Sequence, residues 1–254
     1  MTSTPAATPD ARRAIERYFS DTDRQQERLR AVKGNESRLR LLTRNAVPVR
    51  FRGTARMLLT DAISPLQRRR AEQIEATRRP LRLHLGSGGE PKDGWVNVDL
   101  LGDPVELAWD LARGIPFSDG SAEAVFHEHL LEHIPLRAGY FFLRECFRVL
   151  RPGGVLRVAV PDAGRLAASY AGDRSYLRSL HPEAPTAMLG LQELFYWHRH
   201  TTMYDAETLT LMLRAAGFPA PEQKDFRDSA LDPVPDTESR ALESLYMEAT
   251  KQVT

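Results

Sequence analysis

The stretch from Leu81 to Asp99, LRLHLGSGGEPKDGWVNVD, constrains the fold of this chain more than any other. Leu83 and Leu85 alternate with polar residues, which is typical of a strand that ends at Leu85. A glycine turn follows, and a second strand from Trp95 to Val98 ends on Asp99. Glycines directly after a strand let the backbone approach a ligand closely, and the acid can accept hydrogen bonds from a ribose. The stretch therefore predicts a nucleoside-binding crevice at the carboxyl ends of a parallel sheet.

The connection between these two strands is short, about ten residues from Gly86 to Trp95. A parallel crossover normally needs roughly a dozen residues, usually including a helix. We therefore predict no full helix between Leu85 and Val96. The spacing also argues against a nicotinamide enzyme, because the third glycine of that fingerprint would fall at Pro91 and its ribose acid lies about 20 residues onward.

Beyond this stretch, strand patterns alternate with helical patterns, which predicts a doubly wound, mostly parallel, seven-stranded α/β sheet of the Rossmann-like kind. Further strands are expected at Val105–Trp109, Glu123–His127, Val155–Val160, Gln223–Phe226 and Ser244–Ala249. Helices are expected over Leu136–Leu150, Ala163–Leu180, Thr186–Trp197 and Ala206–Ala216. The stop signals after the first and last of these are Pro152-Gly153-Gly154 and Gly217.

Charge is distributed unevenly along the chain. Residues 1–80 hold 18 Lys+Arg against 9 Asp+Glu, a balance of +9, and residues 81–254 hold 17 against 25, a balance of −8. We expect residues 1–80 to form a basic, mainly helical N-terminal extension and residues 81–254 to form the sheet domain. The expected helical stretches are Ala11–Phe19, Asp21–Asn45 and Thr54–Arg78, the last interrupted by Pro65. Because no aromatic residues interleave with the arginines, we interpret them as a solvated helical face, which makes a nucleic-acid partner unfavoured.

Composition bounds the location of the protein. No apolar run approaches membrane-spanning length, and the N-terminus lacks the apolar core of a secretory signal. Cys146 is alone, which suits a reducing compartment. We expect a cytoplasmic protein without a membrane span, and the sequence has no signal for an oligomeric state.

Five pieces of the chain, in this order and spacing, resemble the class I S-adenosylmethionine-dependent methyltransferases, especially the group that shares the methyltransferase-11 pattern. The resemblance covers about residues 81–162 and does not extend to residues 1–80. The pieces are His84-Leu85-Gly86-Ser87-Gly88-Gly89, Val96-Asn97-Val98-Asp99, Ile115-Pro116-Phe117-Ser118-Asp119-Gly120-Ser121, Leu131-Glu132-His133-Ile134 and Arg148-Val149-Leu150-Arg151-Pro152-Gly153-Gly154.

The resemblance implies S-adenosyl-L-methionine as the cofactor. Gly86, Ser87 and Gly88 would pass beneath its amino-acid end. Asp99 would accept from both ribose hydroxyls, which suits the two oxygens of a carboxylate.

The resemblance also implies roles further along the chain. Asp110 and the backbone of Leu111 match the position that meets the adenine amino group. His127 and Glu128 lie where the backbone of the family faces the methionine moiety. One departure is His84, which replaces the acidic residue that many family members have two positions before the first glycine, so an amino-group contact must come from elsewhere.

Methyl transfer depends mostly on positioning, sometimes with a general base. The candidate bases near the strand ends are His127, His129 and Asp162. Farther along, the segment 197–200 and Tyr204 form a polar-aromatic cluster. We interpret it equally as an exposed surface turn or as a wall of the substrate site. From this cluster we favour His200 as a base or orienter.

The segment from His129 to His133 also matches the inverted H-x-x-E-H zinc motif. A zinc site needs at least three protein ligands, and no third ligand is identifiable in the sequence. We therefore expect no metal.

The sequence thus predicts an S-adenosylmethionine-dependent methyltransferase acting at oxygen or nitrogen of a small-molecule or sugar-type biosynthetic intermediate. The main alternative is an RNA-directed methyltransferase or RNA-binding module that uses the basic N-terminal region. A zinc hydrolase and a cofactor-binding protein without catalysis also stay open.

Overall fold

The computed structural model describes Arg13, Arg17, Ser20 and residues 52–102, 104–196 and 198–252. The helices predicted over Ala11–Phe19 and Asp21–Asn45 otherwise lie outside the described residues, as does Trp197. The chain divides into two compact units, and each is described by itself. Residues 165–199 belong to one unit, and the sheet with the helices that cover it belongs to the other.

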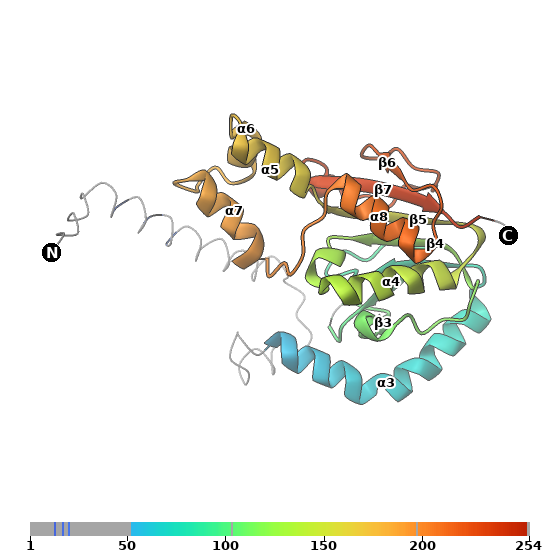
Figure 1. Ribbon diagram of the computed structural model, residues 1–254. Helices are drawn as coiled ribbons and strands as arrows, with labels where there is room; N and C mark the ends of the chain where they lie inside the picture. The colour runs from blue at the N-terminus through green and yellow to red at the C-terminus, as the bar shows by residue number, and fades with distance from the viewer. Residues whose placement is uncertain are drawn as a thin grey trace. The chain divides into compact units, whose positions relative to one another are not determined.

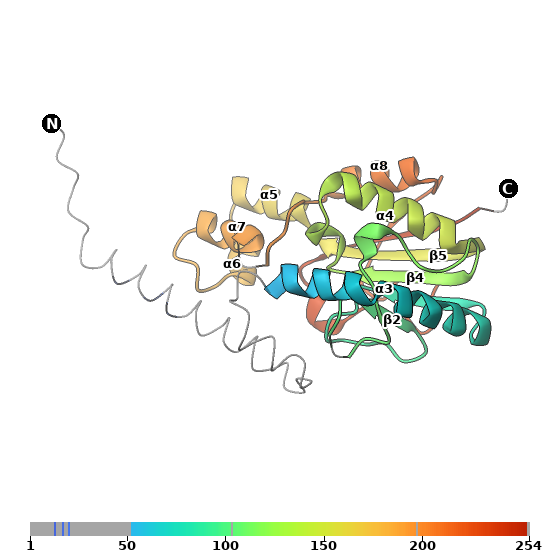
Figure 2. The same cartoon turned by 90° about the horizontal axis from the view of Figure 1, so that it is seen from below.

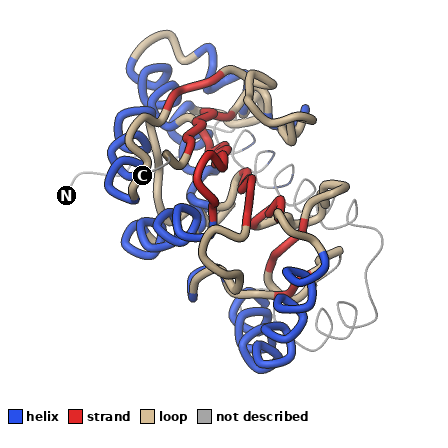
Figure 3. Tube along the Cα trace, turned by 90° about the vertical axis from the view of Figure 1, so that its right-hand side faces the viewer, coloured by secondary structure: helices blue, strands red, loops and turns tan. Residues whose placement is uncertain are grey.

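The second unit is built on a seven-stranded sheet with the order β3-β2-β1-β4-β5-β7-β6 (Figure 1). Only β7 is antiparallel to its neighbours β5 and β6, and the other described pairs are parallel. The strands twist progressively from one edge to the other (Figure 3). This confirms the predicted fold class. The strands are β1 (Leu81–Leu85), β2 (Val96–Asp99), β3 (Leu107–Ala108), β4 (Ala122–Glu128), β5 (Leu150–Pro161), β6 (Glu222–Lys224) and β7 (Ser244–Thr250).

Helices α4 (Leu136–Val149) and α8 (Ala206–Ala216) lie side by side on one face of this sheet (Figure 2). Apolar residues at helical spacing, among them Phe142 on α4 and Leu209 on α8, are buried against the strands. Each such side chain stabilises the fold by roughly 1.5–3 kcal/mol. The predicted stop at Gly217 is confirmed, because Gly217 ends α8 with a φ of 118°.

The remaining helices are shorter. The predicted helix over Ala163–Leu180 is divided in two, and β3 is shorter than predicted. Among the helices of the described residues, none combines the length and the apolar composition needed to cross a bilayer. The elements are α5 (Ala163–Ala171), α6 (Ser175–Leu180), α7 (Ala187–Tyr196) and the 3-10 turns η2 (Leu111–Arg113), η3 (Leu131–His133) and η4 (Glu238–Arg240).

Helix α3 (Arg52–Thr77) continues through Pro65, so the predicted interruption is wrong. Proline lacks the N–H that would close one turn of the helix, and α3 bends near its middle (Figure 1). Beyond the bend, Ala71 and Ile74 are buried in the same core as the sheet, and this packing holds the helix together. The division of the chain at residue 80 stays a prediction, although α3 shares a compact unit with the sheet.

Strand β5 begins at Leu150, five residues before the predicted Val155. Leu150 pairs with Ala122, and the register then shifts so that Val155 pairs with Ala124. The segment 151–154 therefore bulges out of the strand instead of forming a loop before it. Gly154 permits the bulge, because a Cβ there would lie 2.9 Å from the carbonyl oxygen of Arg151.

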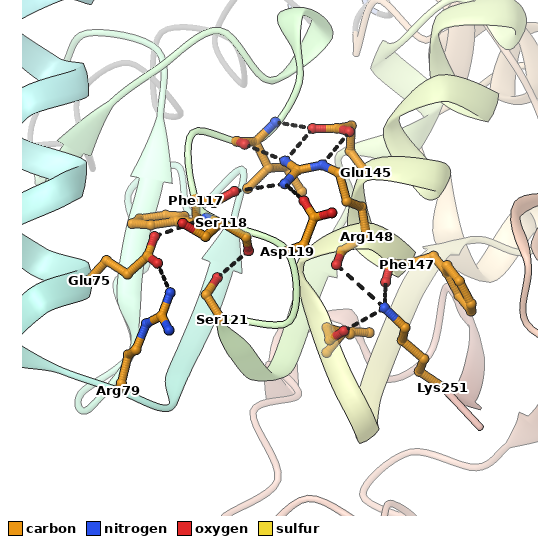
Figure 4. A network of polar contacts seen from close by, with 12 residues as sticks. Glu75, Arg79, Phe117, Ser118, Asp119, Ser121, Glu145, Phe147, Arg148 and Lys251 are labelled. Carbon is orange, nitrogen blue, oxygen red and sulfur yellow. Dashed lines mark hydrogen bonds and ion pairs between the residues drawn. The ribbon is translucent and has the colours of Figure 1, made fainter. Parts of the chain in front are cut away.

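Arg148 ties α4 to the loop that precedes β4 (Figure 4). Its guanidinium donates to the carbonyl oxygens of Ile115 and Phe117, each at 2.8 Å. It also donates to the carboxylates of Asp119 at 2.8 Å and Glu145 at 2.7 Å. Two pieces of the family resemblance therefore meet at the amino end of β4, the edge of the sheet opposite the glycine turn.

We expect Arg148→Ala to lower the free energy of unfolding by roughly 2–3 kcal/mol, because it removes charged hydrogen bonds to several partners. Affinity for S-adenosylhomocysteine should stay within about twofold of the parent, since the network is at the far edge of the sheet. Urea unfolding and calorimetry measure the two effects. Arg144→Ala, an exposed position on the same helix, is the control and should change neither. A large loss of affinity in folded Arg148→Ala would contradict this assignment.

On the face of the sheet opposite α4, the loop 225–236 takes the place of a helix. Arg157 of β5 is fully buried there, and its guanidinium donates to Asp236 through Nε at 3.1 Å and Nη2 at 2.6 Å. It also donates to the carbonyl oxygens of Asp228 at 2.7 Å and Asp225 at 2.9 Å. Arg157 thus attaches the loop to the sheet at three residues, Asp225, Asp228 and Asp236.

Two buried histidines lie in neighbouring strands. His84 Nδ1 is 3.0 Å from Asn97 Oδ1, and burial lowers the pKa of His84 to about 4. His127 on β4 is fully buried against Phe142, and burial lowers its pKa to about 3. Both side chains are therefore neutral in the folded protein near neutral pH.

We expect the protein to lose stability in weak acid. Below the ordinary histidine pKa of 6.5, His84 and His127 bind protons in the unfolded chain but stay unprotonated in the folded chain. The stability present above about pH 6.5 is therefore lost as the pH falls toward the depressed values. Urea midpoints at about pH 7 and about pH 5 measure this loss, and His127→Leu should reduce it by removing one titrating group. An equal loss between the two pH values in the parent and in His127→Leu would exclude the mechanism.

Candidate active site

The glycine turn after β1 folds back over the end of β2. The amides of Gly86 and Ser87 both donate to the carbonyl oxygen of Val98, at 2.8 and 3.2 Å. Gly86 has a φ of 72°, and a Cβ there would lie 2.7 Å from Leu130 Cδ1 in the loop after β4. A side chain at position 86 would therefore separate the two loops that frame this edge of the sheet.

The short crossover contains no helix, as its length predicts; residues 86–95 are all described. The side chain of Asn97 fixes the backbone of this crossover. Asn97 Oδ1 accepts from the amide of Lys92 at 2.8 Å, and Asn97 Nδ2 donates to the Lys92 carbonyl at 3.0 Å. His84 contacts the same Asn97 oxygen, so the residue that departs from the family pattern supports the loop from the core.

Asp99 lies beside the glycine turn with both oxygens engaged. Oδ2 accepts from the amide of Gly88 at 2.7 Å, and Oδ1 accepts from the amide of Leu100 at 2.6 Å. A carboxylate oxygen can accept two hydrogen bonds. Oδ2 therefore has one site left for a ligand hydroxyl, and Oδ1 has one that, among the described residues, only the Arg56 guanidinium approaches, at a long 3.5 Å.

Two observations at this turn fit a bound cofactor. A Cβ built on Gly88 or Gly89 would meet no atom of the described residues within 4 Å, so the space above the turn is open. Ser87 Oγ is buried and has no hydrogen-bond partner among the described residues. A buried hydroxyl without a partner is costly, and a polar ligand at the turn would supply one.

Asp110 lies at the neighbouring strand end. The Trp109 amide donates to the carbonyl oxygen of Asp99 at 2.8 Å, so Asp110 follows the residue that pairs with the end of β2. The Asp110 side chain caps η2 by accepting from the Ala112 amide at 3.0 Å. Leu111 begins that turn with its side chain buried.

Helix α3 reaches the same edge. Arg56 donates to the carbonyl oxygens of Leu101 at 2.9 Å and Leu100 at 3.0 Å, and its guanidinium lies 3.5 Å from Asp99 Oδ1. Thr60 Oγ1 accepts from the Leu101 amide at 2.8 Å. Sequence reasoning missed Arg56, because it is one of many arginines in a segment that the resemblance does not cover.

We expect Arg56→Ala to weaken binding of S-adenosylhomocysteine about 10-fold, because the backbone after Asp99 loses two hydrogen bonds that fix it. Each such bond contributes roughly 1 kcal/mol. Isothermal calorimetry measures the change. Arg69→Ala, at an exposed position on the same helix, is the matched control; a loss in both variants would indicate a general effect of charge.

At the end of β4, neighbouring side chains face opposite ways. His127 points into the core, and neither ring nitrogen has a hydrogen-bond partner among the described residues. This placement does not favour the predicted role of His127 as a base. Glu128 points to the other face, where it accepts from the Thr237 amide at 3.1 Å, and burial raises its pKa.

The loop after β4 brings together residues that are distant in sequence. His129 Nε2 is 2.8 Å from Ser244 Oγ, and its Nδ1 is 3.5 Å from Glu132 Oε1. His200 Nε2 lies 3.9 Å from the same Glu132 oxygen. Burial raises the pKa of Glu132, which is 1% exposed, to about 8.

Asp162, after β5, lies next to this group. It forms a parallel bridge with Tyr204, and the Ala163 amide donates to the Tyr204 carbonyl at 3.1 Å. His129 and Asp162 thus directly follow β4 and β5, and His200 lies near Glu132 in the loop after β4; their roles toward an acceptor stay predictions. From the polar-aromatic cluster, Tyr204 lies at this edge, whereas His198 belongs to the other compact unit.

Comparison with known proteins adds to this geometry. The family described as "Methyltransferase domain" matches residues 99–158. A protein of Mycolicibacterium smegmatis, described as a probable S-adenosylmethionine-dependent methyltransferase, is 34% identical over 104 residues, which are 41% of this chain and 31% of that protein. The segment that these comparisons match is an S-adenosylmethionine-dependent methyltransferase domain. It spans about a third of the length of the curated relative it matches.

Solved methyltransferases are more distant from this methyltransferase domain. Burkholderia thailandensis 1,6-didemethyltoxoflavin-N1-methyltransferase is 17% identical, with 99% of this chain and 94% of that chain covered and a TM-score of 0.45. An S-adenosylmethionine-dependent methyltransferase of Archaeoglobus fulgidus is 15% identical, with 77% and 94% covered and a TM-score of 0.42. Similarity at this level carries no argument about the acceptor.

The family match begins at Asp99 and ends at Val158. Arg56 and His200 both lie outside it, so this family match assigns them no role. Only the folded chain brings them to the edge where Asp99 and Glu132 lie.

Proposed function

We propose that this protein transfers a methyl group from S-adenosyl-L-methionine to oxygen or nitrogen of a small-molecule or sugar-type biosynthetic intermediate. The observation that supports this best is the glycine turn, where open space, the unpartnered Ser87 hydroxyl and the fixed Asp99 carboxylate adjoin one another. This combination suits a nucleoside with a polar, amino-acid-like end.

In this proposal the chain binds the cofactor along the carboxyl edge of β1, β2 and β3. The backbone of Gly86 and Gly88 lies under the amino-acid end, and Ser87 provides its hydroxyl. Asp99 accepts from the ribose hydroxyls, and Asp110 with Leu111 meets the adenine. At the end of β4, the backbone of His127 and Glu128 faces the methionine moiety.

The acceptor site follows from the same edge. Bound S-adenosyl-L-methionine supplies an electrophilic methyl group. We propose that His129, Asp162 and His200 line the space into which an acceptor is placed and orient its oxygen or nitrogen, and that His129 or Asp162 takes up its proton. Positioning of this kind can supply much of the rate, with a base adding roughly 10²–10⁴-fold.

The test is direct. Calorimetry with S-adenosylmethionine and S-adenosylhomocysteine should show one site per chain on the full-length protein, and a metabolite screen with labelled methyl donor should then find an acceptor. Absence of cofactor binding by folded protein would refute the proposal. Cofactor binding without any acceptor would favour a binding protein without catalysis.

No observation favours the RNA alternative. In α3, the Arg68 guanidinium lies 5.5 Å from the centre of the Trp109 ring, so one of the three consecutive arginines is occupied within the chain. An RNA mobility shift that weakens steeply with salt would nevertheless support that alternative. The cytoplasmic location expected from the composition stays a prediction.

A further inference from the structure

Three potential metal ligands converge in the loop after β4. Glu132, His133 and His200 each offer one ligand atom, and these atoms lie within 4.8 Å of one another. The His133 and His200 rings meet edge to face, with centroids 4.8 Å apart. His200 is the third ligand that the sequence motif lacked, because it is 67 residues from His133 and only folding brings it there.

The backbone holds this arrangement in place. The amides of Thr201 and Thr202 donate to the carbonyl oxygen of Glu132 at 2.8 and 3.2 Å. The residue next to His200 is therefore attached directly to the turn that presents Glu132 and His133. These contacts restrict the ligands before any ion binds.

Glu132 is the second, independent indication of a ligand. Its side chain is 1% exposed, and neither carboxylate oxygen has a hydrogen-bond partner among the described residues. A buried carboxylate without partners is unfavourable, and a cation would compensate it. Nearby, His129 Nδ1 approaches Glu132 Oε1 to 3.5 Å while its Nε2 contacts Ser244, so His129 orients the carboxylate from behind.

We propose that Glu132, His133 and His200 bind one divalent metal ion of the Zn²⁺ type. Carboxylate and imidazole are ligands that Zn²⁺ accepts, and three protein ligands leave a fourth tetrahedral position open for water or an acceptor oxygen. The donor atoms must move inward to reach bond lengths of roughly 2.0–2.2 Å.

This set differs from the H-x-x-E-H motif. In the structure, η3 covers only Leu131–His133, and His129 precedes it with a φ of 50°. The helix that would place His129 and His133 on one face does not form. His200 therefore replaces His129 as the third ligand.

The experiment titrates metal-stripped, full-length protein with Zn²⁺ in competition with a chromophoric chelator. We expect one ion per chain, with affinity at least about 100-fold weaker in His200→Ala and in Glu132→Gln, which keeps the shape of the side chain. Co²⁺ should give the visible absorption of a tetrahedral site in the parent and lose it in both variants. His181→Ala removes a histidine from another close His–Glu pair among the described residues, with Glu193 at 2.6 Å, and should leave affinity unchanged.

Several outcomes would overturn the proposal. The first is no Zn²⁺ binding by the parent at micromolar concentrations. The second is binding by His200→Ala and Glu132→Gln as tight as by the parent. The third is a loss of affinity in His129→Ala as large as in His200→Ala. Binding of S-adenosylhomocysteine, measured on the same samples, reports folding of the cofactor site. Metal binding and cofactor binding can therefore fail separately, and failure of one does not decide the other.

Discussion

Asp99→Ala should weaken binding of S-adenosylhomocysteine by at least about 100-fold. The carboxylate is expected to accept from two ribose hydroxyls, and each charged hydrogen bond contributes roughly 1.5–3 kcal/mol, where 1.4 kcal/mol corresponds to tenfold in affinity. The same change also removes the acceptors that fix the amides of Gly88 and Leu100. Calorimetry on the full-length protein measures the effect.

The control for this prediction is Asp93→Ala. Asp93 is an exposed acid in the neighbouring crossover, so its loss changes the local charge equally without touching the turn. Affinity should stay within about twofold of the parent. If folded Asp99→Ala binds like the parent, the cofactor does not bind in this crevice.

Asp236→Ala should lower the free energy of unfolding by roughly 3–5 kcal/mol. Removing one partner of a buried ion pair is strongly destabilising, and the fully buried Arg157 would keep, within the described part of the chain, only the more distant carboxylate of Glu248, at 3.7 Å. The Arg227 amide, 2.8 Å from Asp236 Oδ2, loses its acceptor as well. Urea unfolding of the parent and the variant gives the difference.

A surface pair provides the comparison. Glu123 and Arg151 approach to 3.1 Å but are about a third and a half exposed, so Glu123→Ala should cost less than about 1 kcal/mol. The double change Arg157→Met with Asp236→Leu should recover part of the lost stability, because it removes both buried charges. Equal losses in Asp236→Ala and Glu123→Ala would show that burial of the pair is not what matters.

Local sequence patterns were sufficient to predict the fold class. The sheet follows from strand and helix periodicity, Gly217 ends α8 as its conformational freedom predicts, and the ten-residue spacing correctly excluded a helix after β1. Pro65 and the Pro152–Gly154 segment were misjudged for one reason. Their effect on the backbone was inferred locally, whereas core packing continues α3 past a proline and sheet pairing continues β5 across a bulge.

Only part of the candidate site could be predicted from local sequence patterns. The glycine turn, Asp99 and Asp110 belong to contiguous motifs, so their placement could be predicted. His127 could not be distinguished from His129 in the sequence, because the choice between core and edge depends on which face of β4 packs against α4. Arg56 and the pairing of Glu132 with His200 join segments remote in sequence, and no spacing rule connects them.

The attachment of Arg56 to the loop after Asp99 links the docking of α3 to occupancy of the ribose position. Any ligand that prefers the ordered loop must also favour the docked helix, and by reciprocity a docked helix must favour the ligand. Amide hydrogen exchange in the first turns of α3 should therefore slow when the nucleoside binds. A truncated chain that begins at residue 81 would lose this coupling together with the core residues Ala71 and Ile74. Any assay of the basic segment therefore needs a truncation that keeps α3.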